Sequence, residues 1–315
     1  MSRRTFAIAA ALSVLALKSP MITAIANPLV EKYLDQGLDK YDAGNYQEAI
    51  IDYSKAIEIN PLNVETYVNR ASAKNSLGDY EGAIDDYTKA IDVDPQNADA
   101  YINRGSAKDS TGDYQGAIDD YTKAIDVDPQ NTDAYINRGI AKDWLEDCQG
   151  AIEDYTKALE IDPQKSDAYN LRGNCKSYLE DHEGAIIDYT KALEIDPADT
   201  MIYLNRGETK IDLEDYRGAI DDFTKALEHD PQYAYVYITR GIAKVGLEDY
   251  QGAIDDYTKA LEIPTYDGDD LYADAYYNRG NAKQLANDLE GACDDWKNAV
   301  DLGNERLAER INKQC

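Results

Sequence analysis

The sequence predicts an all-α fold, a solenoid of about eight helix-turn-helix units, from three observations. The 315-residue chain repeats itself at a period of 34 residues, which is typical of paired helices that stack side by side. The residue types that the units share stand three or four positions apart, as on one face of a helix. Prolines mark the end of six successive units: Pro61, Pro95, Pro129, Pro163, Pro197 and Pro231.

The repeat extends from Val30 to Arg306. An insertion at 265–271 delays the last unit, and its residues 266–270 gather carboxylates around a glycine without the spacing of an EF-hand. We expect an acidic loop there, and a closing helix at 305–315. The eight units are 30–63, 64–97, 98–131, 132–165, 166–199, 200–233, 234–267 and 273–306.

The first half of each unit is predicted to be a helix, because a tyrosine and a small residue recur one turn apart. The small residue, at the eighth position, is glycine except in the second unit, which has Ala71. The tyrosine, at the fourth position, is present in every unit: Tyr33, Tyr67, Tyr101, Tyr135, Tyr169, Tyr203, Tyr237 and Tyr276.

The second half of each unit is predicted to be another helix, with alanines on either side of an aromatic residue on one stripe. In the second unit these residues are Ala83, Tyr87 and Ala90. Small residues let two helices approach closely while the rings fill the remaining space. A large side chain at Ala83 should therefore overpack the unit at a cost of about 1–3 kcal/mol.

The turn between the two helices needs a left-handed residue, which Gly44, Gly78 and Gly112 suit in the first three units. A glutamate in this conformation should lower the stability of the fold by a few tenths to about 1 kcal/mol relative to glycine. Units four to seven carry this substitution, as Glu146, Glu180, Glu214 and Glu248.

With this pattern the chain resembles tetratricopeptide-repeat (TPR) proteins. In the second unit the resemblance rests on Ala71, Tyr80, Ala83, Tyr87, Ala90 and Pro95. It implies a right-handed superhelix whose first helices line a concave groove that holds a protein or peptide. The Y-x-N-R-G variant is similar to exported bacterial proteins, particularly from photosynthetic lineages. The family usually has Trp and Leu where this chain has Tyr and mostly Arg at the fourth and seventh positions, so the usual packing at the seventh position does not carry over.

The charge and the composition exclude several functions. With 61 Asp and Glu against 32 Lys and Arg, the formal charge is −29, which argues against binding nucleic acid or an anionic membrane directly. The two histidines, His182 and His229, stand at structural positions of the repeat, and no catalytic, phosphate-binding or metal-binding motif occurs. We therefore expect a non-enzymatic protein without a cofactor or metal.

Residues 1–26 have the three parts of a secretory signal: Arg3 and Arg4, an apolar run at 6–17, and a small-x-small site ending at Ala26. Export to a periplasm, a thylakoid lumen or the medium is expected. An uncleaved anchor is the alternative, and the paired arginines leave both the twin-arginine and the general export route open.

Four cysteines follow the signal, an even number that suits an oxidising compartment. Cys148 and Cys175 replace a usual Tyr and Ala on helices that should be neighbours, so we predict a disulfide between them. Cys293 and Cys315 could pair similarly. Buried free thiols are the alternative for both pairs.

Arginine at the seventh position and lysine one turn later recur from the second unit on, beginning with Arg70 and Lys74. They could form a ladder for an acidic ligand. Because an aspartate stands at the twenty-third position of every unit, beginning with Asp52, internal Arg–Asp pairs are the favoured interpretation.

The concave positions predict a peptide-binding groove. An asparagine amide both donates and accepts, so a ladder of asparagines could hold a peptide backbone, as in some family members. The ladder is Asn69, Asn103, Asn137, Asn205 and Asn278. The apolar contacts would come from Ile102, Ile136, Trp144 and Tyr178. The acidic rim is Glu65, Asp99, Asp133, Asp167 and Asp274.

This groove suits a basic, partly apolar peptide or protein segment. The predicted function is a scaffold for assembly or maintenance of an envelope or lumenal complex. The alternative is a structural solenoid that self-associates into homo-oligomers and holds no peptide.

Overall fold

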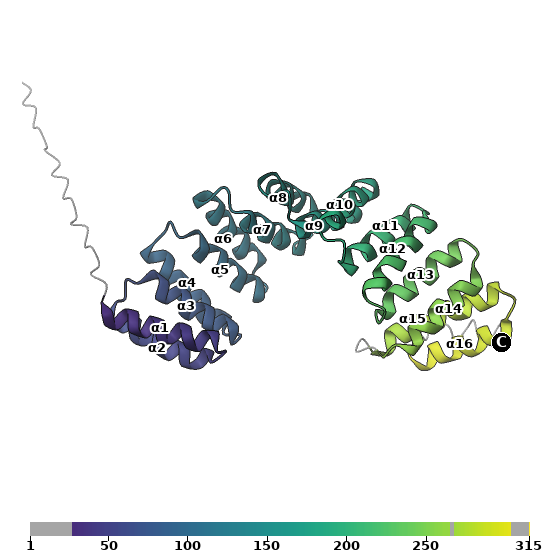
Figure 1. The fold of residues 1–315 in the computed structure, drawn as a ribbon, viewed down its shortest axis with the longest axis horizontal. Coiled ribbons are helices and arrows are strands. Elements are labelled where there is room, and N and C mark those ends of the chain that lie inside the picture. The colour runs from purple at the N-terminus through teal and green to yellow at the C-terminus, as the bar shows by residue number, and fades with distance from the viewer. Residues whose placement is uncertain (1–26, 265–267, 304–314) are drawn as a thin grey trace, which may run out of the picture.

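The structure is a computed structural model that describes residues 27–264, 268–303 and 315. This part of the chain forms sixteen helices and no strand, and the helices follow one another along an arc (Figure 1). The first eight are α1 (Pro28–Asp42), α2 (Tyr46–Ile59), α3 (Val64–Ser76), α4 (Tyr80–Val93), α5 (Ala98–Ser110), α6 (Tyr114–Val127), α7 (Thr132–Trp144) and α8 (Cys148–Ile161). The last eight are α9 (Ser166–Tyr178), α10 (His182–Ile195), α11 (Thr200–Asp212), α12 (Tyr216–His229), α13 (Ala234–Gly246), α14 (Tyr250–Glu262), α15 (Gly268–Leu285) and α16 (Leu289–Asp301).

Each unit consists of an odd-numbered helix packed against the following even-numbered helix, which in turn packs against the first helix of the next unit. Odd-numbered helices also contact the next odd-numbered helix. Among the described helices, no even-numbered one contacts the next even-numbered one. The odd-numbered helices therefore lie on the inner side of the arc, and the prediction of an all-α superhelical solenoid is confirmed.

Small residues bring the two helices of a unit together, as unit three shows. Ala117 and Ala124 are fully buried on either side of the buried ring of Tyr121. A Cβ atom added to Gly105 would lie 2.7 Å from Cε1 of that ring, closer than atoms of a packed core approach. The core of the described units is consequently a row of small clusters, most of which contain one buried ring.

The turns inside the units have the left-handed residue that the sequence predicts. Gly44, Gly78 and Gly112 have φ of 76°, 78° and 80°. The four glutamates keep the same conformation, for example Glu146 with φ 62°. Its N–H donates to the carbonyl of Asp143 at 2.8 Å, which satisfies a carbonyl at the helix end. The next residue, Asp147, caps α8 by accepting from the N–H of Gly150 at 3.0 Å.

The predicted internal Arg–Asp pairs are also confirmed. Arg104 donates to both carboxylate oxygens of Asp120, at 2.9 and 2.6 Å, and its third nitrogen donates to Thr88 of the preceding unit at 3.0 Å. Lys108 lies 2.9 Å from the same carboxylate, and Arg104 stacks over the ring of Tyr101. The repeated pairs are Arg70–Asp86, Arg104–Asp120, Arg138–Asp154, Arg172–Asp188, Arg206–Asp222, Arg240–Asp256 and Arg279–Asp295.

The insertion before the last unit is shorter than the expected loop. α15 begins at Gly268, so residues 268–271 are helical, and the prediction of a loop across them is wrong. Leu271 explains the difference, because it packs against the buried cluster that contains Tyr257 and Ile263. Residues 265–267 lie outside the described part.

The predicted signal at 1–26 and most of the predicted closing helix, residues 304–314, also lie outside the described residues. Across the residues that the structure does describe, no helix is both long enough and apolar enough to cross a membrane.

Candidate functional site

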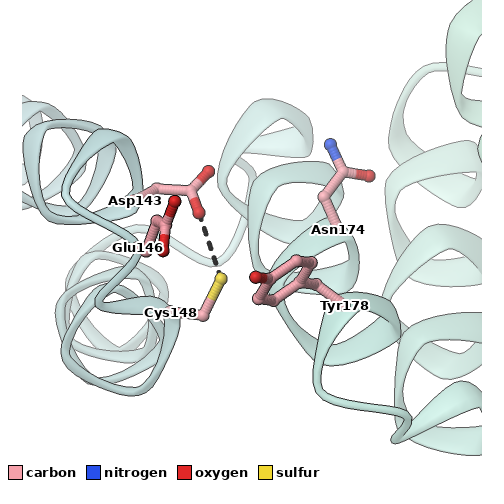
Figure 2. Close-up of a pocket in the computed structure, with 5 residues that line it drawn as sticks. All are labelled: Asp143, Glu146, Cys148, Asn174 and Tyr178. Carbon is pink, nitrogen blue, oxygen red and sulfur yellow. Dashed lines mark hydrogen bonds between the residues drawn. The ribbon is translucent and has the colours of Figure 1, made fainter.

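Two hollows that share a wall lie on the inner side of units four to six. The first, of about 350 Å³, is lined by Asp143, Glu146, Cys148, Asn174 and Tyr178 (Figure 2). Asn174 and Tyr178, both on α9, also line the second hollow. The remaining residues of the second hollow are Ser177, Tyr189, Asn205, Glu208, Thr209 and Asp212. We refer to the two hollows together as the central groove.

The first hollow exists because unit four has a small residue where most units have a tyrosine. In unit three this tyrosine, Tyr114, stacks on Trp144 of the next unit, with ring centroids 5.7 Å apart and planes 4° from parallel. In unit four the equivalent residue is Cys148, which stands opposite Tyr178 (Figure 2). A thiol is much smaller than a phenol ring, so the space between α7 and α9 stays open.

Cys148 and Cys175 are both buried thiols, and both donate to one carboxylate oxygen. The distances from Asp143 Oδ1 are 3.1 Å to the sulfur of Cys148 and 3.4 Å to that of Cys175. Burial raises the pKa of both thiols, and the Asp143 carboxylate raises it further. These two residues are neighbours, as expected, but both are free cysteines, so the predicted disulfide between them is absent.

The other pair is covalently joined: Cys293 and Cys315 form a disulfide with their Cα atoms 5.7 Å apart. This bond ties α16 to the C-terminal residue of the chain.

The central groove is acidic. Its four acids, Asp143, Glu146, Glu208 and Asp212, form no ion pair with any other described residue. Glu208 accepts a hydrogen bond from the hydroxyl of Tyr235 at 2.9 Å. Burial raises the pKa of Glu208 above its usual range, and the neighbouring Asp212 raises it further. The repeated arginines and lysines cannot neutralise these acids, because they are held by the buried aspartates of the units.

The predicted aromatic residues are the most exposed rings on this side. Trp144 is 66% exposed and Tyr178 is 68% exposed, although both are large hydrophobic residues. They end α7 and α9 at the same repeat position, so they stand one unit apart beside the central groove.

The five predicted asparagines are all half-buried on odd-numbered helices, but they differ in their bonding. Asn205 lines the central groove and donates to the side-chain oxygens of Asn170 and Asn174, both at 3.1 Å. Asn69 lines a separate hollow between units one and two. Within the described part of the chain, four amides of the ladder have no hydrogen-bond partner: Asn69, Asn103, Asn137 and Asn278.

The predicted apolar contacts at the fifth position are largely taken up by the core. Ile102 packs against the cluster of Tyr121, and Ile136 against the cluster of Tyr155, so each offers only part of its surface. Leu204 and Ile238 at the equivalent position are 3% exposed, so they offer almost no surface to a peptide. The acidic rim residues Glu65, Asp99, Asp133, Asp167 and Asp274 are all exposed.

Sequence reasoning missed Asn174 and Glu208 in the central groove, and Asn170, which accepts a hydrogen bond from Asn205. Asn170 and Cys148 depart from the residue types that most units have at their repeat positions, and this signal was available in the sequence. Asn174 and Glu208 both stand at the ninth position, where no residue type predominates, so the repeat gave no signal for them.

Comparison with family models matches most of the chain to helical repeats. A model described as TPR repeat matches residues 37–74 and 71–108, and three described as tetratricopeptide repeat match 98–131 and 166–199, 132–165, and 204–270. Comparison with curated protein sequences gave no significant match.

Solved structures show the same architecture. A crystal structure of MamA protein is 30% identical over 54% of this chain and 92% of that chain, with a TM-score of 0.51. The structure of YrrB, described as a TPR protein with an unusual peptide-binding site, is 26% identical over 58% of this chain and 95% of that chain, also at 0.51. A tetratricopeptide repeat protein from Parabacteroides merdae ATCC 43184 covers 84% of this chain and 99% of that chain, at 21% identity and a TM-score of 0.59, and supports the fold alone.

Proposed function

The chain belongs to the tetratricopeptide-repeat family and is a protein–protein interaction scaffold, and we propose that it binds an extended, basic, partly apolar peptide segment of a partner in the central groove. The observation that carries this proposal is the pair of exposed rings, Trp144 and Tyr178, beside hollows whose carboxylates have no cation. Exposure of large rings to water is unfavourable, and such rings frequently contribute much of the binding energy of an interface.

The charge of the groove determines what kind of segment fits it. Glu146, Asp212 and the rim acids are exposed, and of these residues only Asp133 pairs with a described cation, Lys165, at 3.0 Å. A segment with lysine or arginine would be attracted to these acids, while its apolar residues would cover the rings. An acidic segment would be repelled by the same side chains.

Beyond the central groove, the asparagine ladder would supply backbone contacts where the segment extends along the inner side of the other units. Four of its amides have no partner of their own, so a peptide bond could both donate to and accept from them. Each such hydrogen bond contributes only about 1 kcal/mol, so several must act together. YrrB is described as a TPR protein with an unusual peptide-binding site, and this supports a peptide as the occupant.

The setting that we propose is outside the cytoplasm, in a periplasm, a thylakoid lumen or the medium. Support comes from the secretory pattern of residues 1–26 and the disulfide between Cys293 and Cys315. There the scaffold would hold a partner during assembly or maintenance of an envelope or lumenal complex, without catalysis.

A peptide array tests the groove. Basic-apolar, acidic-apolar and neutral peptides are probed with the wild type, with Trp144→Ala/Tyr178→Ala, and with the control Ile51→Ala/Ile187→Ala. The control removes two apolar side chains that are 49% and 62% exposed on even-numbered helices, away from the groove. Loss of an anchor ring typically costs about 2 kcal/mol or more, so the groove variant should bind at least ~30-fold more weakly.

Equal binding by all three proteins, or a preference for acidic peptides, would contradict the proposal. Light scattering of the wild type over a range of concentrations completes the test. If its mass rises with concentration and no peptide binds, the alternative of a self-associating structural solenoid would replace the scaffold.

A further inference from the structure

The thiol pair of the central groove has a geometry that the proposed peptide binding does not use. Asp143 near the end of α7, Cys148 at the start of α8 and Cys175 on α9 each direct one possible ligand atom to the same point. These three atoms all lie within 4.8 Å of one another. We propose that Asp143, Cys148 and Cys175 bind a thiophilic divalent cation of the zinc type at the junction of units four and five.

The distances are close to those that such an ion imposes. Zn–S bonds of ~2.3 Å and Zn–O bonds of ~2.0 Å in a tetrahedron separate sulfur from oxygen by roughly 3.5 Å. The two sulfurs lie 3.1 and 3.4 Å from Asp143 Oδ1, so the carboxylate and the thiols need to move apart only slightly to admit the ion. The ion would replace the two thiol protons that now point at the oxygen.

The choice of metal follows from the ligands. Two thiolates favour zinc or another soft divalent ion over calcium and magnesium, which prefer oxygen alone. The carboxylate completes three negative ligands, and an ion with two positive charges neutralises most of them. Three protein ligands leave the fourth position of a tetrahedron open.

The surroundings suit a bound ion. Cys148 and Cys175 are 4% and 1% exposed, so the ion would be shielded from water on the side of the core. The first hollow opens on the other side. There the carboxylate of Glu146 stands beside the carboxylate of Asp143 and the thiol of Cys148 (Figure 2). Glu146, a water molecule or a partner's side chain could provide the fourth ligand there.

A second observation comes from Tyr155, whose ring packs in the same buried cluster as the two cysteines. Its hydroxyl is buried and has no hydrogen-bond partner in the described part of the chain. In unit three the equivalent Tyr121 donates to Asp109, which occupies the repeat position of Asp143. In unit four that aspartate faces the thiols instead, which leaves an unpaired polar group beside the proposed ion.

Cobalt titration of the whole chain, purified under reducing and anaerobic conditions, tests the site. One Co²⁺ per chain should bind with a thiolate-to-metal charge-transfer band, and Zn²⁺ should displace it. Cys175→Ser and Asp143→Asn should each weaken binding by more than ~100-fold, because loss of even an outer partner of a metal ligand typically costs about 10- to 100-fold.

Two controls make the result specific. Asp109→Asn changes the same repeat position in unit three, where no cysteine is near, and should leave the affinity unchanged. Cys293→Ser/Cys315→Ser removes the other thiols that a reductant could release, and should also keep the band. Circular dichroism checks the fold, and Cys148→Ser replaces Cys175→Ser if the latter does not fold.

Three results would overturn the proposal. The first is the absence of a charge-transfer band in fully reduced protein. The second is a band that survives loss of Cys175 or Cys148. The third is a count of no free thiols in the isolated protein under denaturing, non-reducing conditions, since the structure requires two.

Discussion

The buried ion pairs of the units provide the sharpest test of how this solenoid is held together. Changing Arg104 to methionine keeps most of the apolar stem but removes three hydrogen bonds, two to Asp120 and one to Thr88 of the preceding unit. The Asp120 carboxylate is only 4% exposed, so it cannot regain full hydration when Arg104 is lost. The change should destabilise both the unit and its contact with unit two.

The magnitude follows from what remains around Asp120. Removing one partner of a buried ion pair typically costs about 3–5 kcal/mol. Lys108 stays 2.9 Å from the carboxylate and compensates part of the charge, and the Arg104 side chain is itself 16% exposed. We therefore expect a loss of about 2–3 kcal/mol for Arg104→Met. Lys108→Met should cost less, about 1 kcal/mol, because it leaves the bidentate pair intact and breaks one contact to Asp120 and one hydrogen bond to the carbonyl of Gly116.

Native-state hydrogen exchange of the α5 and α6 amides, followed in urea, measures the local loss, because long repeat arrays do not unfold in one step. A double-mutant cycle of Arg104→Met with Asp120→Asn should give a coupling of about 2 kcal/mol. If the two changes are additive, or if Arg104→Met costs no more than Lys108→Met, then the bidentate pair does not stabilise the fold as argued.

Two further predictions concern single positions. Burial raises the pKa of Asp109 above its usual value. Its charged form therefore lowers the free energy of unfolding at neutral pH, and this loss disappears as the pH falls through the folded-state pKa. Asp109→Asn should therefore be more stable than the wild type near neutral pH, with the difference in urea midpoint shrinking in acid; a difference that does not change with pH would be inconsistent with a raised pKa. Glu214, with φ 59°, should gain about 0.5–1 kcal/mol when changed to glycine, and Gly112→Glu, at φ 80°, should lose a similar amount. Urea unfolding checks this pair, and changes of the same sign would refute the backbone explanation.

The regular part of the structure could be predicted because its determinants recur in nearly every unit. The spacing of Tyr101 and Gly105 predicts one turn of a helix. Arg104 and Asp120 are the two partners of an ion pair, and both recur along the sequence. When both partners of a contact repeat with the same spacing, their contact repeats too. The left-handed turns were predictable for the same reason, since Glu146 and its equivalents stand where glycine stands in the first units.

The candidate site was harder to predict because it depends on residues that differ from the repeat. Cys148 leaves a space only because it faces Tyr178 of the next unit, and the two thiols meet at Asp143, which accepts from both. The fifth position illustrates the same limit, since Ile136 is half-buried and Ile238 is buried at equivalent places. These differences arise from the neighbouring units, which the repeat average does not describe.

The distribution of charge connects the regular part with the site. Each repeated unit from the second on places an arginine and a lysine against one buried aspartate, as Arg138 and Lys142 do against Asp154. Most of the repeated cations are thus used inside the solenoid, where they outnumber the buried acids. The side chains that face solvent must therefore be more acidic than the net charge of −29 suggests. The ion pairs that fix the shape of the solenoid also leave its inner side negative, and this supports a cationic occupant, whether a peptide or a metal ion.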